Sequence, residues 1–526
     1  MTRRILVLLA VMTIVSMVAA CTAAPGAAVE TVEEEVVKEE EEEATVEDTA
    51  DPGQIKEGGT LTIAIGGDMD NFDPQAMTLI IFSDMFRFQV YGSLARINEN
   101  LELVPDLAES WEIVDASTYI VKLREGVKFH NGREMTAEDV KFSFERVKDM
   151  APTLARYGQG IDSIEILDDY TIQFNLATAN AYFMDDSTWV SIIPQEAAET
   201  LASEPIGTGP FKFVEWIPND RIVLERFEDY WDEGKPYVDQ VVLRVMPDVQ
   251  ARIASLEAGE VDVVRDVSVV DALRFLDSED ISVIKPDSST AIQYFVMVGG
   301  QNEAIMNSFR VRQALAHALD KDAVNRTAWM GQGTPLVSPI PPSVIHAAEF
   351  EGYPYDPEKC KEILAEEGYP DLEVTVETIS GFSDGKQAAV IWQAGLAECG
   401  VTMNIVESEI AVWLDKYIGQ EYEVSWNAAG LSANPNDWMD RGASRWIRAG
   451  TWVNEEAIEL WEAGKSEIDP QKAAENFARL QEINVEELPV IMIGAAPSVS
   501  LVQSDVKNWH VSPSQLRLYR EVWLDQ

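Results

Sequence analysis

The chain has 526 residues, with 91 acidic against 40 basic side chains and a formal net charge of −51 at pH 7. This charge argues against nucleic acid as a partner, because binding to phosphates needs concentrated lysine and arginine, and it disfavours adsorption to an anionic lipid surface. Hydrophobic residues make up 46% of the chain. Its length exceeds what one hydrophobic core usually holds, so we expect a globular body of two or three lobes.

The first twenty residues are typical of a secretion signal. Two arginines near the start precede an apolar run over residues 5–18, which is too short for an easy membrane span. Small residues then lead into Cys21, an arrangement that resembles a bacterial lipobox, in which cleavage leaves a diacylated cysteine. We expect residues 1–20 to be a lipoprotein signal peptide and Cys21 to carry lipid. An ordinary signal peptide cut just before Cys21 is the alternative.

An acidic segment separates Cys21 from the body. Residues 22–51 hold twelve acidic side chains and one lysine. Such a segment buries too little apolar surface to offset its ordering entropy, and like charges extend it. We expect residues 21–57 to be a disordered tether.

The first half of the body alternates between strand and helix patterns. Thr136 is followed three residues later by Asp139, which predicts a capped helix start. From apolar periodicity and turn residues we expect strands at 58–67, 119–124, 126–133, 161–176, 221–226 and 241–246, and helices at 79–97, 136–147 and 248–258.

The second half alternates helix and strand in the manner of an α/β lobe. We expect helices at 311–319, 357–367, 384–398 and 470–487, and strands at 372–378, 401–406 and 489–501. Cys360 and Cys399 both lie on expected helices. An exported compartment permits a disulfide between them, but we expect two buried free thiols, because sequence alone does not bring them together.

Several blocks, in this order, resemble the family 5 extracellular solute-binding proteins of ABC importers, which include oligopeptide-, dipeptide- and nickel-binding proteins. The longest block is LVPDLAESWEIVDASTYIVKLREGVKFHNGREMTAEDVKFSFERV at 103–147. The others are PIGTGPFKF at 205–213, FEDYW at 227–231, NSFRVRQALAHALD at 307–320 and YDPEK at 355–359. The resemblance covers about residues 58–500.

The resemblance implies an α/β fold of the two-lobed periplasmic-binding-protein type II (clamshell) class, with an extra subdomain in the first lobe. Lobe I would comprise 55–288 plus 495–526, with the inserted subdomain at about 76–190, and lobe II would comprise 289–494. The implied function is to capture a peptide-like solute between the lobes and deliver it to a membrane permease. We expect a monomer without a cofactor, lipid-anchored in the periplasm or at the cell surface.

The resemblance also guides the search for the ligand site. In peptide-binding members an acid shortly before a proline pairs with the α-amine of the ligand; the matching positions before Pro435 are Leu431 or Ser432, and neither is acidic. Asp437 could substitute. Nearby tryptophans and asparagines suit apolar side chains or sugar hydroxyls, so an oligosaccharide is the alternative ligand. A loop after the first strand adds polar groups. The ligand-binding candidates are Asp70, Asn71, Asp73, Trp413, Trp426, Asn427, Asn434, Asp437 and Trp438, with core packing or a solvated turn as the alternative for each.

Other readings of the chain have less support. The GTGPFK turn lacks P-loop spacing, His130 belongs to a predicted turn, and the four histidines are too scattered for a directly held metal. An exported hydrolase is the alternative from another class, although neither a G-x-S-x-G nor an H-E-x-x-H motif is present. A sensory receptor with the same body is a third possibility.

Overall fold

The computed structural model describes residues 55–77, 86–150, 152–286, 289–430, 433–439, 451–512 and 518–526. The predicted signal peptide, Cys21, almost all of the tether, Leu431 and Ser432 lie outside these ranges. Within them, no helix combines the length and the apolar character needed to cross a membrane.

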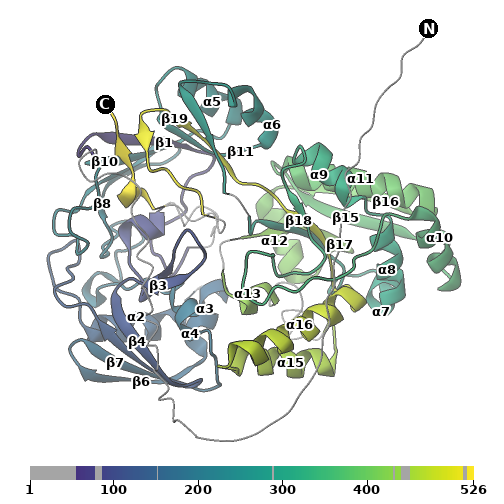
Figure 1. Ribbon diagram of the computed structural model, residues 1–526, viewed down its shortest axis with the longest axis horizontal. Coiled ribbons are helices and arrows are strands. Elements are labelled where there is room, and N and C mark those ends of the chain that lie inside the picture. Colours follow the sequence, from purple (N-terminus) through teal and green to yellow (C-terminus); the bar gives the residue numbers. More distant parts are fainter. Residues whose placement is uncertain are drawn as a thin grey trace, which may run out of the picture. The chain divides into compact units, whose positions relative to one another are not determined.

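A seven-stranded sheet forms the first large core. Its order is β12-β19-β11-β1-β10-β9-β8, with β1 parallel to both β10 and β11. The strands are β1 (Thr60–Ile65), β8 (Phe211–Ile217), β9 (Arg221–Arg226), β10 (Gln240–Val245), β11 (Val263–Val267), β12 (Ile281–Ile284) and β19 (Val499–Gln503). The helices α5 (Val249–Glu257) and α6 (Val269–Ala272) share a buried apolar cluster with β11 and β19 (Figure 1).

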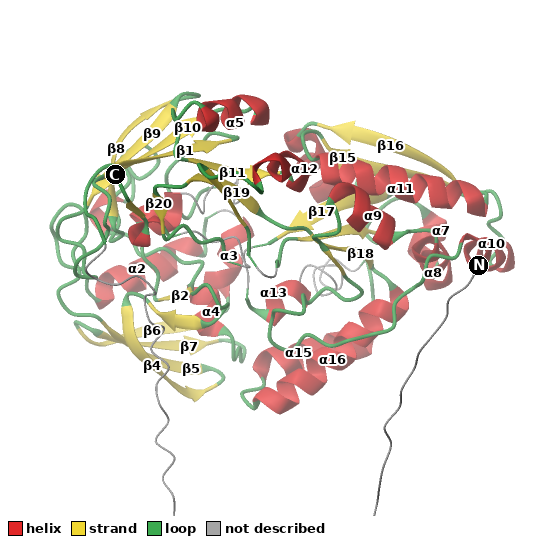
Figure 2. Ribbon diagram, turned by 45° about the horizontal axis from the view of Figure 1, so that its top comes forward, coloured by secondary structure: helices red, strands yellow, loops and turns green. Residues whose placement is uncertain are grey.

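A four-stranded antiparallel sheet lies in the chain between β1 and β8. Its order is β4-β5-β7-β6, formed by β4 (Ala108–Asp115), β5 (Thr118–Leu123), β6 (Ile161–Asp168) and β7 (Thr171–Leu176). The helix α2 (Ala137–Val147) packs on this sheet through Val140, Phe144 and Val147, which share its apolar core (Figure 2). Two short helices follow, α3 (Pro152–Gln159) and α4 (Phe183–Ser187).

A six-stranded sheet forms the second large core, in the order β14-β18-β13-β17-β15-β16. Its strands are β13 (Ile292–Val296), β14 (Thr334–Pro335), β15 (Glu373–Ile379), β16 (Thr402–Ser408), β17 (Val424–Ala429) and β18 (Val490–Ala495). The associated helices are α7 (Glu303–Asn307), α8 (Phe309–His317), α9 (Lys321–Ala328), α10 (Pro357–Glu366), α11 (Ser383–Cys399), α12 (Ile410–Gly419), α13 (Pro435–Met439), α15 (Glu455–Ser466) and α16 (Pro470–Glu487).

Short elements complete the described part of the chain. They are the strand pairs β2 (Ala95–Ile97) with β3 (Leu103–Pro105) and β20 (Val506–Lys507) with β21 (Trp523–Leu524), and the 3-10 turns η1 (Gln195–Ala197), η2 (Leu273–Phe275) and η4 (Tyr519–Glu521).

Local signals predicted several elements correctly. The helix at 470–487 is α16, with Pro470 in its first turn and an Asp469 cap. Thr136 and Asp139 form the expected capping box of α2. Gly400, with φ +89°, ends α11 in the left-handed conformation that glycine adopts without strain.

Three predicted elements were wrong. The single strand expected at 489–501 is two strands, β18 and β19, in different sheets, because Pro497 lacks the N–H that a continuous ladder requires. The strand expected at 126–133 reduces to one isolated bridge between Lys128 and Glu134. Residues 95–97, expected at the end of a helix, form β2, whose residues pair with β3.

The expectation of two free thiols was also wrong. Cys360 on α10 and Cys399 at the end of α11 form a disulfide, with their Cα atoms 5.8 Å apart. Packing of α10 on α11 brings the two cysteines together across 39 residues of chain. That helix pairing is a tertiary event, which local sequence patterns do not reveal.

Candidate functional site

Charged side chains from distant parts of the chain meet where α3 and α4 approach α13. Arg156 on α3 donates from Nη2 to Oδ1 of Asp437 on α13 at 3.2 Å. Asn434, just before α13, donates from Nδ2 to Oδ1 of Asp186 on α4 at 3.1 Å. Figures 1 and 2 both show α13 beside α3 and α4. We call Asp185, Asp186 and Asp437 the carboxylate cluster.

The start of α13 fixes the direction of Asp437. Pro435 is the first residue of the helix, where its missing N–H costs nothing. The side-chain oxygen of Asn434 accepts a hydrogen bond from the N–H of Asn436 at 2.9 Å, as a helix cap does. Trp461 on α15 donates to Oδ1 of Asn436 at 2.6 Å, which ties α13 to α15. Asp437 is therefore presented by an anchored turn.

Two acids of the carboxylate cluster have raised pKa values. Burial is the main cause that raises the pKa of Asp185 to about 7, and the negative charge of Asp437 adds to the effect. The same two causes raise the pKa of Asp186 to about 7, against hydrogen bonding from Asn180 and the charge of Arg156. Asp437 is 4% exposed. A cationic group arriving here would relieve repulsion among these carboxylates.

An aromatic stack borders the cluster. Tyr157 and Trp189 lie face to face, with ring centroids 5.9 Å apart and an interplanar angle of 3°. Both side chains are buried. The guanidinium of Arg156 lies 4.7 Å from the Tyr157 ring centre and donates to the Tyr157 hydroxyl at 2.6 Å. The stack and the ion pair thus share Arg156.

Further contacts join the same two parts of the chain. The backbone N–H of Ala181 donates to the carbonyl of Lys465 on α15 at 2.8 Å. Tyr182 packs edge-on against Phe477 of α16, with 5.9 Å between ring centroids. The carboxylate cluster therefore lies beside a contact that includes apolar packing.

Two sequence-predicted residues, Asn434 and Asp437, belong to this site. Trp438 follows Asp437 in α13 and is fully buried. Asn427 on β17 is 5% exposed, and its Nδ2 has no hydrogen-bond partner among the described residues. An unsatisfied buried donor of this kind carries a free-energy cost that a ligand could remove.

Two predicted tryptophans lie in the core beside the six-stranded sheet. Trp413 donates from Nε1 to the hydroxyl of Ser425 at 3.0 Å and stacks on Tyr417. Trp426 is fully buried, and its ring centroid lies 5.7 Å from that of Phe382. Their observed contacts are those of packing residues.

The predicted Asp70–Asp73 loop is tied to α2. Asp70 is exposed and accepts from the N–H of Asn71, whose side chain accepts from the N–H of Asp73, each at 3.0 Å. Arg146 of α2 binds both carboxylate oxygens of Asp73, with 3.1 Å between Nη1 and Oδ1. Asp73 thus holds the loop against the helix, and a ligand role for this loop stays a prediction.

Sequence reasoning missed Arg156, Tyr157, Asp185, Asp186 and Trp189. One signal was available: two adjacent acids interrupt the apolar run YFMDDSTWV at 182–190. Adjacent acids within a buried segment call for a functional or structural reason, because carboxylates are rarely buried without partners.

The turn at 205–210 serves the fold. The N–H of Gly209 donates to the Val90 carbonyl at 2.9 Å, and a Cβ on Gly207 would lie 2.1 Å from that oxygen. His130 contacts the Gly209 carbonyl at 2.9 Å through Nε2, and burial lowers its pKa to about 4. Within the described ranges, no three or more His, Cys, Asp or Glu side chains gather so that they could hold a metal ion.

Comparison with known proteins identifies the family. The model described as "Bacterial extracellular solute-binding proteins, family 5 Middle" matches residues 102–442. Heme-binding protein A of Haemophilus influenzae is 32% identical over 388 residues, covering 66% of this chain and 70% of that protein. Glutathione-binding protein GsiB of Pectobacterium atrosepticum is 30% identical over 353 residues, covering 65% and 68%.

A solved structure of a similar protein has the same fold. The ABC transporter-associated periplasmic binding protein DppA of Helicobacter pylori, in complex with the peptide STSA, superposes with a TM-score of 0.79 at 27% identity. The match covers 90% of this chain and 99% of that one. It confirms the predicted two-lobed periplasmic-binding-protein type II class. The chain belongs to family 5 of the bacterial extracellular solute-binding proteins.

Proposed function

We propose that this protein captures a peptide with a free α-amine for an ABC importer and holds that amine at Asp437. The observation that carries the proposal is the carboxylate cluster, where two half-buried acids of α4 interact with the charge of the buried Asp437 on α13 and have a pKa raised to about 7. An ammonium group would add positive charge beside these acids and favour their ionised form. Similarity to a glutathione-binding protein and to a protein solved with the peptide STSA supports a peptide ligand.

The remaining candidates take supporting roles. The stacked pair Tyr157 and Trp189 would form an apolar wall beside the solute, and Asn427 and Asn434 would offer amide groups for hydrogen bonds. Lobe I would comprise 55–288 plus 495–526, and lobe II 289–494. The solute would bridge the lobes and shift an open ensemble toward a closed form that the permease recognises. The contacts between α3, α4 and α13 support a site that needs both lobes.

The ligand class is tested by thermal shift. Di- to pentapeptides are expected to raise Tm, because a ligand that binds only the native state stabilises it. N-acetylated versions of the same peptides should raise it much less. A strong shift with disaccharides and none with peptides would replace the peptide by an oligosaccharide, which the unsatisfied amide of Asn427 would favour.

We also propose that the protein is a monomer and has no catalytic activity. Peptides incubated with the purified protein should be recovered intact. Turnover that disappears in the Asp186→Asn variant would contradict the binding-only proposal.

The anchor is a separate part of the proposal. Lipid on Cys21 and an acidic tether over residues 21–57 would keep the receptor near its permease. The Cys21→Ala variant should be released from membranes into the soluble exported fraction. Retention of that variant in the membrane fraction would contradict the anchor.

A further inference from the structure

The turn at residues 180–182 joins two parts of the chain outside the carboxylate cluster. Tyr182 directly precedes α4, yet its side chain belongs to the apolar cluster of the six-stranded sheet. It is 7% exposed. The next residue, Phe183, packs instead in the core of the four-stranded sheet, against Tyr119 and Phe174. Two neighbouring aromatic side chains therefore fill two different cores, and Tyr182 is the one that crosses over.

Two parallel rings receive Tyr182. His346 and Phe477 are stacked, with ring centroids 5.7 Å apart and an interplanar angle of 11°. The Tyr182 ring meets both of them edge-on, with centroid distances of 6.4 Å to His346 and 5.9 Å to Phe477. Edge-to-face contacts of this kind are favourable beyond the area that they bury. We call His346 and Phe477 the ring pair.

A buried hydrogen-bond network holds the ring pair in place. Gln481, one turn after Phe477 on α16, is fully buried. Its Nε2 donates to the His346 carbonyl at 2.9 Å and to the Phe477 carbonyl at 3.0 Å. Its Oε1 accepts from the Ser338 hydroxyl at 2.8 Å. These contacts do not involve Tyr182, so the ring pair has its own support.

The turn that carries Tyr182 is supported in the same way. The side-chain oxygen of Asn180 accepts from the N–H of Tyr182 at 3.1 Å, and the Asn180 carbonyl accepts from the Tyr119 hydroxyl at 2.7 Å. Beside this turn, the N–H of Ala181 donates to the Lys465 carbonyl on α15 at 2.8 Å. Because each side is held by contacts of its own, joining the two sides costs little ordering entropy.

This contact is linked to the carboxylate cluster from both sides. Asn180 also donates from Nδ2 to Oδ2 of Asp186 at 2.7 Å. Lys465 lies one turn after Trp461 on α15, and Trp461 donates to Asn436 of α13. The contact therefore bears on α4 and α13, the same two short helices that present the carboxylates.

We propose that the docking of Tyr182 against the ring pair is a latch between the two lobes, so that Tyr182 raises the affinity for the solute without touching it. Tyr182 lies in the proposed lobe I and the ring pair in the proposed lobe II. The inference rests on the proposed function, in which the solute is held between the lobes. A contact made only when the lobes are joined favours the closed form, and the apparent affinity follows the fraction of closed molecules.

The first part of the test needs no solute. Hydrogen–deuterium exchange of the full-length protein reports on the amide of Ala181, which is protected while it donates to the Lys465 carbonyl. Tyr182→Leu is expected to speed this exchange by about tenfold. Phe174→Leu is the matched control, because Phe174 is fully buried and its ring contacts, Phe144 and Phe183, lie in its own core. It should lower Tm and leave the Ala181 amide protected.

The second part is calorimetric titration with the peptide STSA. Tyr182→Leu is expected to weaken binding by about tenfold, whereas Phe174→Leu should bind as the wild type does. Tyr182→Phe keeps the ring and should keep the wild-type affinity. His346→Leu should weaken binding in the wild type but have no further effect in Tyr182→Leu, because the contact between the two rings is then already lost.

The outcomes separate the latch from its alternatives. Unchanged peptide affinity in Tyr182→Leu, with a loss of Tm like that of Phe174→Leu, would make Tyr182 a packing residue and overturn the inference alone. Additive effects of Tyr182→Leu and His346→Leu on affinity would also overturn it, because the two rings would then act independently. If the wild type binds neither STSA nor any other di- to pentapeptide, the proposed function fails and the inference fails with it.

Discussion

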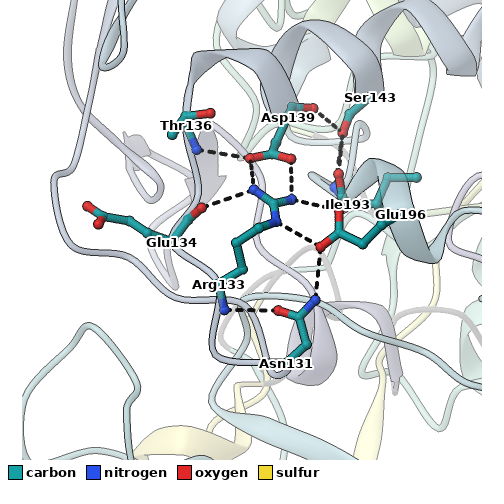
Figure 3. Close-up of polar contacts among 8 residues, drawn as sticks. All are labelled: Asn131, Arg133, Glu134, Thr136, Asp139, Ser143, Ile193 and Glu196. Atoms are coloured by element: carbon teal, nitrogen blue, oxygen red, sulfur yellow. Dashed lines mark hydrogen bonds and ion pairs between the residues drawn. The ribbon is translucent and has the colours of Figure 1, made fainter.

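Two arginine–carboxylate clusters differ in the direction in which the pKa values of their acids are shifted. Arg133 donates to both oxygens of Asp139 at 2.6 and 2.9 Å, to both oxygens of Glu196 at 2.7 and 3.0 Å, and to the Glu134 carbonyl at 3.1 Å (Figure 3). Hydrogen bonding from Arg133 is the main cause that lowers the pKa of Glu196 to about 2. The Arg133 network thus stabilises the ionised form of Glu196.

The cluster around Arg156 shows the opposite behaviour. Arg156 donates to Asp437 at 3.2 Å and to the Tyr157 hydroxyl at 2.6 Å, and burial raises the pKa of Asp185 and Asp186 to about 7. Hydrogen bonding from an arginine thus lowers the pKa of an acid in one cluster, whereas burial and a neighbouring carboxylate raise the pKa of two acids in the other, and raised pKa values of this kind are frequent at binding sites. Mutations in the two clusters are therefore expected to change stability in opposite directions.

The largest expected effect on stability comes from Asp139→Ala. Asp139 is buried and accepts from the partly exposed Arg133 and from the N–H of Thr136, so its loss breaks both this ion pair and the cap of α2. We expect the free energy of unfolding to fall by about 3 kcal/mol, measured by urea denaturation. Peptide affinity should not change. Glu138→Ala, an exposed neighbour in the same helix turn, is the control.

A smaller effect of opposite sign is expected from Asp185→Asn. The fold raises the pKa of the Asp185 carboxyl from 3.8 to about 7. The resulting contribution to the free energy of unfolding is fully present below pH 3.8, and it is lost as the pH rises through 7 and the buried carboxyl ionises. The neutral variant should therefore be more stable than the wild type at pH 8, by on the order of 1 kcal/mol, and similar at pH 4. Denaturation at both pH values checks this, with the exposed Asp162→Asn as control. A variant less stable at pH 8 would contradict the assignment.

The smallest expected effect comes from Glu196→Gln. A lowered pKa stabilises the fold above the ordinary value of 4.5 and loses that contribution as the pH falls through about 2. Because about half of the Glu196 side chain is exposed, we expect less than 1 kcal/mol at pH 7. The difference between variant and wild type should vanish on acidification. A difference in stability that grows at low pH would contradict the lowered pKa of Glu196.

The contrast also marks what the sequence could reveal. The Thr136–Asp139 cap is a local pattern, and it was predicted correctly. Asp437 was chosen as a candidate because Pro435 gave a reference point in the family resemblance, and its ligand role stays a prediction. Asp186 was not chosen from the sequence, because its partner Asn434 lies 248 residues away and only tertiary packing joins them.

Burial explains why the aromatic residues of the candidate site could not be predicted from the sequence. Trp413 and Trp426 were chosen for the chemistry of their rings, yet the fold places both in the core of the six-stranded sheet. Tyr157 and Trp189, whose stack borders the carboxylate cluster, carry the same chemistry without a local pattern to distinguish them. Residue type indicates what a side chain can bind, and only the fold decides which side chains share a site.

The central claim is that Asp437 receives the α-amine of the solute. The most direct measurement is a calorimetric comparison of a free and an N-acetylated peptide on the wild type and on Asp437→Asn. We expect acetylation to weaken binding to the wild type by about 30-fold or more, since a charged partner in a buried pair is worth about 2 kcal/mol or more. On Asp437→Asn the two peptides should bind with nearly equal affinity. An acetylation penalty of the same size in the variant would contradict the account.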